Sequence, residues 1–376
     1  MTAFSGSFSA VDLDDTEALL AADHDGALWA ASTAGAQVRA TAAAVDEGAL
    51  DGVRNESRDY PPRSVIWLST RGAAAMAGSM LAAVRGDAAR APLVLAAEAP
   101  AWIGSLDVLA VAGDDPGDPA LVAAAAAGVR RGARVVVVAP YEGPLRDATA
   151  GRAAVLEPRI AVRAEFGLLR YFAAGLAVLD AVGAAGEAPV DLGAIADELD
   201  AEALRNSAAR ELFTNPAKLL ADRMVGREVA LAGDCAATLA LARHGSATML
   251  RIGRTAVAAV GLADAVSALR ARSAVGRDVS DIFHDEQIDG PAGDRLRVLV
   301  LTLHEERTVV AARINGLGDV DLVAAGDVPM ALGASEDVAG PTESLASAGS
   351  GPTEQQLAVL AVRLEMAAAY VRLLRG

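Results

Sequence analysis

The sequence predicts an α/β protein built from two doubly wound parallel sheets. Short apolar runs without polar alternation follow one another from residue 64 onward, which is typical of strands buried on both faces. Alanine-rich helical stretches lie between them, and strand alternating with helix indicates a parallel sheet. A similar order restarts after residue 214, and 376 residues are enough for two domains of ordinary size.

The first half begins with helix and continues as alternating strands and helices. Residues 12–53 carry apolar residues at three- and four-residue steps, which predicts helix, and residues 54–63 with Pro61-Pro62 read as a turn. Strands are expected at 64–69, 91–98, 107–113 and 133–140, with helices at 74–85, 119–131 and 163–186.

The second half repeats the pattern. Helices are expected at 215–226, 235–245, 306–316 and 354–376, strands at 227–234, 295–303 and 319–326, and a Gly/Ser/Pro-rich loop at 332–355. We therefore expect an N-terminal helical segment at 1–60, a first domain at 61–186, a helical connection at 187–213 and a second domain at 214–376.

Composition excludes several classes of protein. The net charge of −16 argues against nucleic-acid binding, and no apolar run is long enough to span a membrane. The absence of a signal-like N-terminus and a single cysteine predict a cytoplasmic protein without disulfides. We expect no cofactor. We also expect no metal, because the histidines and the cysteine lack ligand spacing: His24, His244, His284, His304 and Cys235.

One stretch has the layout of a phosphate-binding loop. In "SVIWLSTRGAAAMAGSM", residues 64–80, an apolar run breaks at Ser69, Thr70, Arg71 and Gly72 and then becomes helical. A loop between a strand and a helix N-terminus presents N–H groups and hydroxyls to an anion. These four residues are the predicted anion site.

Two segments carry a resemblance to a known family. The small-residue loop followed by "DVLAVAGDDPGDPALVAAAAAGVRRGARVVVVAP" resembles a sugar isomerase (SIS) domain. "NPAKLLADRMVGREVALAGD", from Asn215, is similar to the opening of the second SIS domain of bifunctional phosphoglucose/phosphomannose isomerases. The resemblance extends from Ser64 onward and implies two SIS domains, a small phosphorylated sugar as ligand and a homodimer.

The resemblance also places a second phosphate-binding loop at residues 110–119, including Gly113, Asp114 and Asp115. The family has hydroxyl side chains there, and this chain has acids, which repel a phosphate dianion. Lys218, the only lysine, matches the family's Asn-Pro-Ala-Lys, where a domain contact is expected rather than catalysis.

The catalytic groups of the family are not matched. Its general base lies on a helix that corresponds here to residues 244–259, where Ile252 and Gly253 stand near the expected carboxylate. Its ring-opening histidine should follow, but residues 260–273 contain none. His284, between acids, and Glu211 are weak substitutes, and His244 reads as a C-terminal helix cap.

The sequence thus predicts a sugar-phosphate-binding protein of hexose-phosphate metabolism whose isomerase chemistry is lost or weak. One alternative is an active aldose–ketose isomerase that interconverts glucose 6-phosphate or mannose 6-phosphate with fructose 6-phosphate. A second is a non-catalytic structural partner in a dimer.

Overall fold

The computed structural model describes residues 11–86, 88–185, 189–275, 296–327 and 351–375. These residues form two compact units, each with one sheet. The β1–β5 unit comprises the described residues of 33–200 and 353–361. The β6–β9 unit comprises those of 1–32, 201–352 and 362–376.

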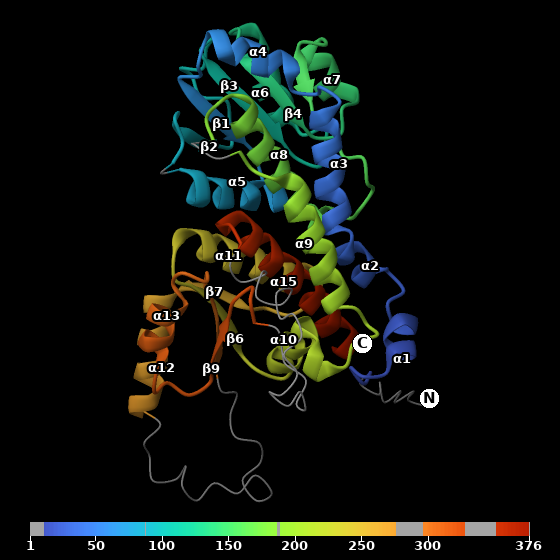
Figure 1. The fold of residues 1–376 in the computed structure, drawn as a ribbon, viewed down its shortest axis with the longest axis vertical. Helices are drawn as coiled ribbons and strands as arrows, with labels where there is room; N and C mark the ends of the chain where they lie inside the picture. The colour runs from blue at the N-terminus through green and yellow to red at the C-terminus, as the bar shows by residue number, and fades with distance from the viewer. Residues whose placement is uncertain (1–10, 87, 186–188, 276–295, 328–350, 376) are drawn as a thin grey trace, which may run out of the picture. The chain divides into compact units, whose positions relative to one another are not determined.

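The sheet of the β1–β5 unit is parallel throughout, in the order β2-β1-β3-β4-β5 (Figure 1). Ile66 pairs with Val94 on one side and with Leu109 on the other, which fixes the register of the central strands. The strands are β1 (Ser64–Leu68), β2 (Leu93–Ala96), β3 (Asp107–Ala112), β4 (Arg134–Val138) and β5 (Ala153–Val155).

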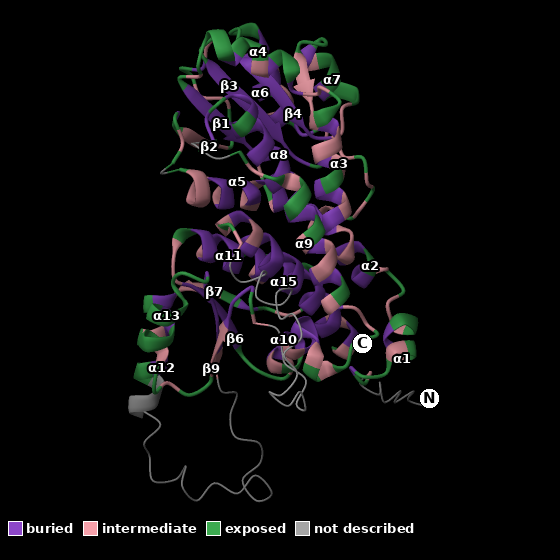
Figure 2. Cartoon of the chain, viewed as in Figure 1, coloured by how far each residue is buried: buried purple, intermediate pink, exposed green. Residues whose placement is uncertain are grey.

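Both faces of this sheet are covered, so its central strands are buried along their whole length (Figure 2). Ile66, Leu109 and their alternate neighbours pack on α6 (Pro119–Arg130) and on Leu145 of α7 (Gly143–Thr149). The opposite face meets α5 (Gly72–Arg85) and α8 (Leu168–Ala181), and α3 (Ala34–Asp46) packs on α8. Trp67 fixes α5 there, because its indole N–H donates to the carbonyl of Ala74 (2.9 Å).

The β6–β9 unit repeats the arrangement with one strand fewer. Its parallel sheet has the order β7-β6-β8-β9, which matches β2-β1-β3-β4. The strands are β6 (Val229–Gly233), β7 (Ala258–Gly261), β8 (Arg297–Leu301) and β9 (Val320–Val323). The predicted fold class, two doubly wound parallel sheets, is confirmed.

Helices flank this second sheet as well. α12 (Leu262–Val275) and α13 (Arg307–Ile314) pack on one face around Val298 and Val300. α11 (Ala236–Arg251) lies against β6, β7 and β8. The unit also contains α10 (Pro216–Met224) and, from residue 362, α15 (Thr353–Arg375).

Several predicted elements were wrong in their limits. Residues 12–53 are not one helix but α1 (Thr16–Ala22), α2 (Ala27–Ser32), α3 and the start of α4 (Asp51–Asp59). The first break is a turn in which the Asp23 carboxylate accepts the N–H groups of Ala27 (2.8 Å) and Leu28 (2.9 Å). The predicted turn at 54–63 is helical as far as Asp59, so it is the prolines that end the helix.

The remaining differences concern the limits of helices and elements that were not predicted. The helix predicted at 163–186 begins only at Leu168, after the 3₁₀ turn η1 (Ala164–Phe166). The family helix placed at 244–259 ends at Arg251, and β7 follows. The elements β5, α7, β7 and α12 were not predicted; β5, α7 and β7 are short, and β7 is partly exposed. The predicted loop at 332–355 lies largely outside the described residues.

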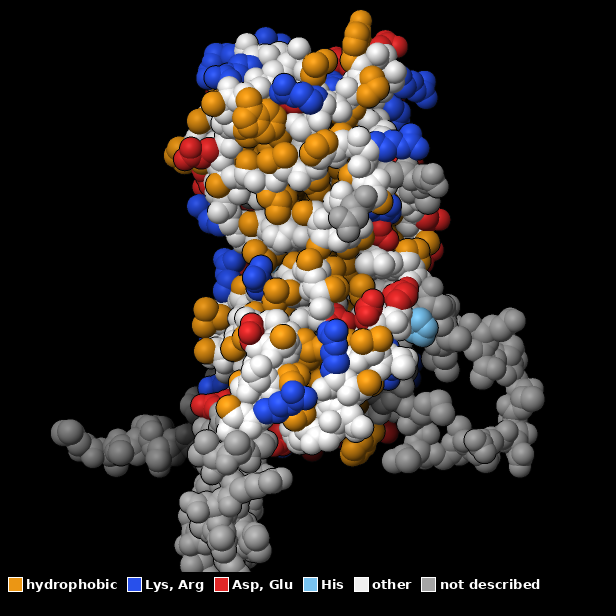
Figure 3. Space-filling view, turned by 90° about the vertical axis from the view of Figure 1, so that its left-hand side faces the viewer, with side chains coloured by type: hydrophobic (Ala, Val, Ile, Leu, Met, Phe, Trp, Pro, Cys, Tyr) orange, Lys and Arg blue, Asp and Glu red, His pale blue; other side chains and the backbone are white. Residues whose placement is uncertain are grey.

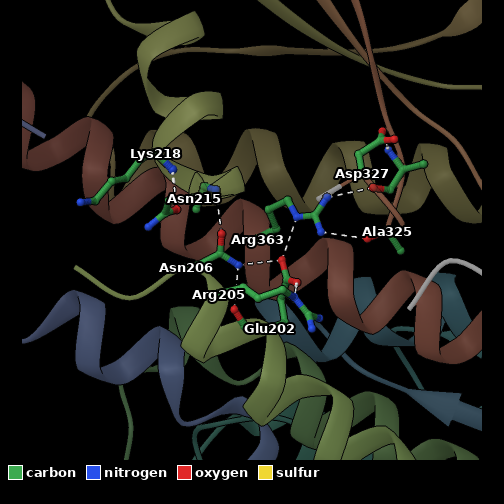
Figure 4. Close-up of polar contacts among 10 residues, drawn as sticks. Glu202, Arg205, Asn206, Asn215, Lys218, Ala325, Asp327 and Arg363 are labelled. Atoms are coloured by element: carbon green, nitrogen blue, oxygen red, sulfur yellow. Dashed lines mark hydrogen bonds and ion pairs between the residues drawn. The ribbon is translucent and has the colours of Figure 1, made fainter. Parts of the chain in front are cut away.

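A buried ion pair organises the β6–β9 unit (Figure 4). Arg363 of α15 donates from Nε to Glu202 (2.7 Å), near the end of α9 (Leu192–Arg205). Its terminal nitrogens donate to the carbonyls of Ala324 (2.8 Å) and Ala325 (2.9 Å), just after β9. Arg205 donates to the other oxygen of Glu202 (2.9 Å). Burial by itself would raise the pKa of Glu202, but the two guanidiniums outweigh it and hold the pKa below its usual range.

The same network continues to the only lysine of the chain (Figure 4). Asn206 donates to Glu202 (2.7 Å) and accepts from the N–H of Ala217 (2.7 Å), and Asn215 caps α10. The ammonium of Lys218 donates to three carbonyls: Leu13 (2.5 Å), Ala208 (2.9 Å) and Arg210 (2.6 Å). An ammonium has three donors, so Lys218 is fully used in holding its own unit together.

The environment of a second buried carboxylate shifts its pKa in the opposite direction. Glu365 of α15 contacts His244 of α11, with 3.0 Å between Oε1 and Nε2. Burial raises the pKa of Glu365, and the histidine offsets this only in part. His244 lies within α11 and is 3% exposed, so its predicted role as a C-terminal cap was wrong.

These two glutamates make a matched pair for a stability test. Glu202 has a depressed pKa, so its contribution is present above its unfolded value of 4.5 and is lost as pH falls through the folded pKa. Glu365 has a raised pKa, so its contribution is complete below 4.5 and is lost as pH rises through the folded pKa.

We expect Glu202→Gln to lower the free energy of unfolding at pH 7 by about 3–5 kcal/mol, because it leaves Arg363 buried without its carboxylate. Glu365→Gln should be neutral or stabilising at pH 8 and should flatten the decline of stability from pH 5 to pH 8. Urea unfolding of both variants at pH 5, 7 and 8 measures this. Equal destabilisation by both substitutions at pH 8 would contradict the assignment.

Candidate functional site

The order of the strands in the β1–β5 unit creates a switch point between β1 and β3. The chain leaves β1 toward β2 on one side and later returns to β3 on the other. In open α/β sheets the loops that follow two such strands diverge, and ligands bind between them at the carboxyl ends. The predicted site residues Ser69–Gly72 and Gly113–Asp115 stand in these two loops.

The loop after β1 leads directly into a helix. Ser69 follows β1, and its N–H donates to the carbonyl of Ala96 (3.0 Å). Gly72 begins α5 with a φ of +66°, a left-handed conformation that favours glycine. The N-cap residue, Arg71, makes no side-chain hydrogen bond to the first N–H groups of this helix, which have no partner within the helix itself.

The hydroxyl and guanidinium of this loop already have partners. Thr70 donates from its hydroxyl to Oδ2 of Asp118 (2.9 Å). Arg71, exposed, lies 3.5 Å from the same oxygen and 3.8 Å from a carboxylate oxygen of Asp115. The groups that could hold a phosphate therefore contact carboxylates of the chain itself.

The loop after β3 supplies these carboxylates. Asp118 caps α6 through the N–H of Ala120 (2.9 Å). Burial alone would raise the pKa of Asp118, but the bonds from Ala120 and Thr70 and the charge of Arg71 hold it below its usual range. Asp115 is exposed and accepts the N–H of Gly117 (2.8 Å).

Asp114 turns toward α8 and not toward Arg71. It accepts hydrogen bonds from the hydroxyl of Tyr171 and from Arg170 (3.1 Å). Burial raises the pKa of Tyr171, so this phenol remains a donor. Gly113 follows β3, and its N–H donates to the carbonyl of Val138 (3.2 Å). Arg170 and Asp118 are site residues that the sequence did not single out, because only the folded loops bring them to Asp114 and Thr70.

The β6–β9 unit has an equivalent switch point, between β6 and β8, which sequence reasoning missed. Asp234 follows β6, and its carboxylate accepts the hydroxyls of Thr238 (2.7 Å) and Thr302 (3.0 Å). Thr302 follows β8 directly. As in the other unit, a carboxylate and a threonine join the two loops at the carboxyl edge of the sheet. The signal was the repeated strand order, which places these loops together.

Of the two predicted catalytic substitutes, only Glu211 lies among the described residues. Glu211 is exposed and precedes the 3₁₀ turn η2 (Leu212–Thr214) without capping it through its side chain. His284 lies outside the described residues. Ile252, near the expected position of the family's base, is 1% exposed at the end of α11.

The described residues also bear on two other classes of site. Within residues 11–86, 88–185, 189–275, 296–327 and 351–375, no three His, Cys, Asp or Glu side chains are grouped as metal ligands would be. In the same part of the chain no helix combines the length and apolarity needed to cross a membrane.

No family model and no curated protein matches this sequence, but solved structures match its fold. Tagatose-6-phosphate ketose/aldose isomerase from Escherichia coli aligns over 90% of this chain and 91% of its own, at 13% identity and a TM-score of 0.57. The C-terminal domain of glucosamine-fructose-6-phosphate aminotransferase from Francisella tularensis aligns over 93% and 95%, at 11% identity and a TM-score of 0.55.

A third structure, a protein from Silicibacter pomeroyi assigned as a phosphosugar isomerase, aligns over 92% of this chain and 96% of its own, at 14% identity and a TM-score of 0.53. At such identities the likeness concerns the fold. The chain therefore has the two-sheet α/β fold seen in phosphosugar isomerases.

Proposed function

We propose that this protein binds a phosphorylated hexose at the β1/β3 switch point and does not isomerise it. The observation that carries the proposal is the uncapped N-terminus of α5, preceded by Ser69, Thr70 and Arg71 at the carboxyl edge of the sheet. Helix N–H groups, two hydroxyls and one guanidinium are the donors that a phosphate group needs. The tagatose-6-phosphate isomerase and the glucosamine-fructose-6-phosphate aminotransferase domain, which share this fold, act on sugar phosphates by name, and this supports a sugar phosphate as the class of ligand.

The neighbouring acids limit the affinity of this site. A phosphate at Arg71 must compete with Asp115 and Asp118, which lie within 4 Å of that guanidinium. Each like charge near a phosphate costs on the order of 1–4 kcal/mol, depending on how well solvent screens it. Asp115 is 56% exposed in its side chain, so its penalty lies toward the lower end.

Charge substitutions should move the affinity in opposite directions. We expect Asp115→Asn to strengthen binding of glucose 6-phosphate or mannose 6-phosphate about fivefold, a gain on the order of 1 kcal/mol. Arg71→Ala should weaken it about tenfold, because it removes a charge-assisted contact. Titration calorimetry measures both changes, with Arg130→Ala, on the exposed end of α6, as a control. Absence of binding in all variants at millimolar ligand would refute the site.

Isomerase activity is expected to be absent. The reaction needs a base that moves a proton between neighbouring carbons, and loss of such a group costs roughly 10²–10⁴ in rate. Ile252 is buried where the family places its base, and His244 is engaged with Glu365 inside the protein.

A coupled assay of glucose 6-phosphate or mannose 6-phosphate conversion to fructose 6-phosphate should therefore give the background rate. His284→Ala and Glu211→Ala should leave that rate unchanged. Clear turnover that either substitution abolishes would show instead that the protein is an active isomerase with a relocated base.

The second candidate role, a structural partner in a homodimer, is favoured by an exposed apolar patch. β2 is an edge strand, and Figure 3 looks onto this side, where hydrophobic side chains gather on the surface of the β1–β5 unit. Four large hydrophobic side chains are exposed in this part of the sequence, Tyr60, Leu95, Trp102 and Leu106, and Leu95 belongs to β2 itself. Unpaired strand edges and apolar patches are common contact surfaces.

If two copies meet through this patch, Leu95→Lys should shift the protein toward monomer. Light scattering over a range of concentrations would detect the change in mass. Leu250→Lys, at an exposed leucine of the other unit, is the control. A wild-type protein that is monomeric at all concentrations would rule out this role.

A further inference from the structure

A pocket whose charged lining residues are mostly arginines lies in the β6–β9 unit. It has a volume of about 350 Å³ and is formed by α10, β9, the start of α13 and α15. Leu219 and Leu322 contribute apolar walls, and four charged residues line the rest: Arg223, Arg307, Asp327 and Arg363. None of the predicted site residues lines it, and it is separate from the Asp234–Thr302 contact.

Arg363 is the fixed charge of this pocket. It is 1% exposed, and its three nitrogens are hydrogen-bonded to Glu202 and to the carbonyls of Ala324 and Ala325. Those carbonyls belong to the segment that leads from β9 to Asp327. Arg363 therefore holds one wall of the pocket in place.

The other two arginines of the pocket come from two different helices, α13 and α10. Arg307, at the first position of α13, pairs with Asp327. Asp327 is itself oriented by the N–H of Ala324 (2.8 Å). Arg223, on α10, lies 3.4 Å from Asp321 of β9, but that carboxylate is already bonded to Arg297 at 2.5 Å. Arg223 thus shares its counter-charge with another arginine.

The lining of the pocket is therefore positive. Its lining residues include three arginines and one aspartate, a formal charge of +2 for the lining itself, while Glu202 and Asp321, which pair with Arg363 and Arg223, are not among them. This local surplus stands in a chain with a net charge of −16. The β1/β3 loops, in contrast, set three aspartates against two arginines.

We propose that this pocket binds a small organic anion with an apolar or ring-shaped body. Guanidinium groups pair with planar carboxylate and phosphate oxygens through parallel hydrogen bonds, so Arg223 and Arg307 hold the anionic group. The body of the ligand lies against Leu219 and Leu322. A pocket of about 350 Å³ is at the small end of the range for ligand sites. The proposal is independent of the sugar-phosphate site.

Phenyl phosphate and phenylacetate are suitable probes, because they share the aromatic body and differ in the anionic group. Inorganic phosphate tests the contribution of the body, and benzyl alcohol tests that of the charge. Calorimetric titration of the full chain should show saturable binding of at least one of the two aromatic anions. Inorganic phosphate should bind more weakly and benzyl alcohol not at all.

Substitutions of the lining arginines test whether the aromatic anion binds in this pocket. Arg223→Ala and Arg307→Ala should each weaken the aromatic anion about tenfold, the usual effect of losing one charge-assisted hydrogen bond. Arg313→Ala, an exposed arginine on the same helix as Arg307, should change nothing. Arg71→Ala should also leave this binding intact, which separates it from the β1/β3 site. Melting temperatures of the free proteins identify any variant that is merely misfolded.

Three results would overturn the proposal. The first is no saturable binding of either aromatic anion by the wild-type protein at millimolar concentration. The second is equal loss of affinity in Arg223→Ala, Arg307→Ala and Arg313→Ala, which would indicate general surface charge. The third is benzyl alcohol binding as tightly as the anions, which would show that the arginines do not contribute.

Discussion

Both sheets are parallel throughout, and a parallel strand can be added only by a crossover that carries the chain back across a face of the sheet. In the β1–β5 unit the chain moves outward from β1 to β2 and then returns past β1 to β3. In the β6–β9 unit it makes the same reversal from β7 to β8. This connectivity places the loops after β1 and β3, and those after β6 and β8, at a diverging edge of each sheet. The candidate phosphate site, and its counterpart in the second unit, exist because of this constraint.

The two switch points share a chemical feature. Thr70 and Asp118 join the loops after β1 and β3, and Asp234 and Thr302 join the loops after β6 and β8. In each case a carboxylate of the chain receives a hydroxyl hydrogen bond at the place where open α/β proteins bind ligands. The internal carboxylate satisfies donors that an anion would otherwise engage. Such a site costs little stability when empty, but a phosphate must displace or tolerate a negative charge to enter it.

In the β6–β9 unit, the buried charged groups stabilise the structure, and the proposed ligand contacts are made by other, more exposed arginines. Glu202, Arg363 and Lys218 are hydrogen-bonded at short distances and connect α9, α10, α15 and the end of β9. Arg223 and Arg307 lie at the more exposed rim, where one shares its carboxylate and the other pairs with an aspartate. Because the buried groups fix the walls, we expect Arg223 and Arg307 to exchange partners with a ligand without loss of the fold.

The sequence by itself determined the fold class, the strands of both sheets except β5 and β7, and the loop from Ser69 to Gly72. These features depend on local patterns: uninterrupted apolar runs, alanine-rich helices and a small-residue loop after a strand. It did not determine the breaks within residues 12–53, because a side chain of the turn itself, Asp23, caps the next helix. Nor could it place Asp118 on Thr70, Arg170 on Asp114 or three arginines around one pocket. Those residues stand tens to more than a hundred positions apart in the sequence, and only the packing of helices on parallel sheets brings them together.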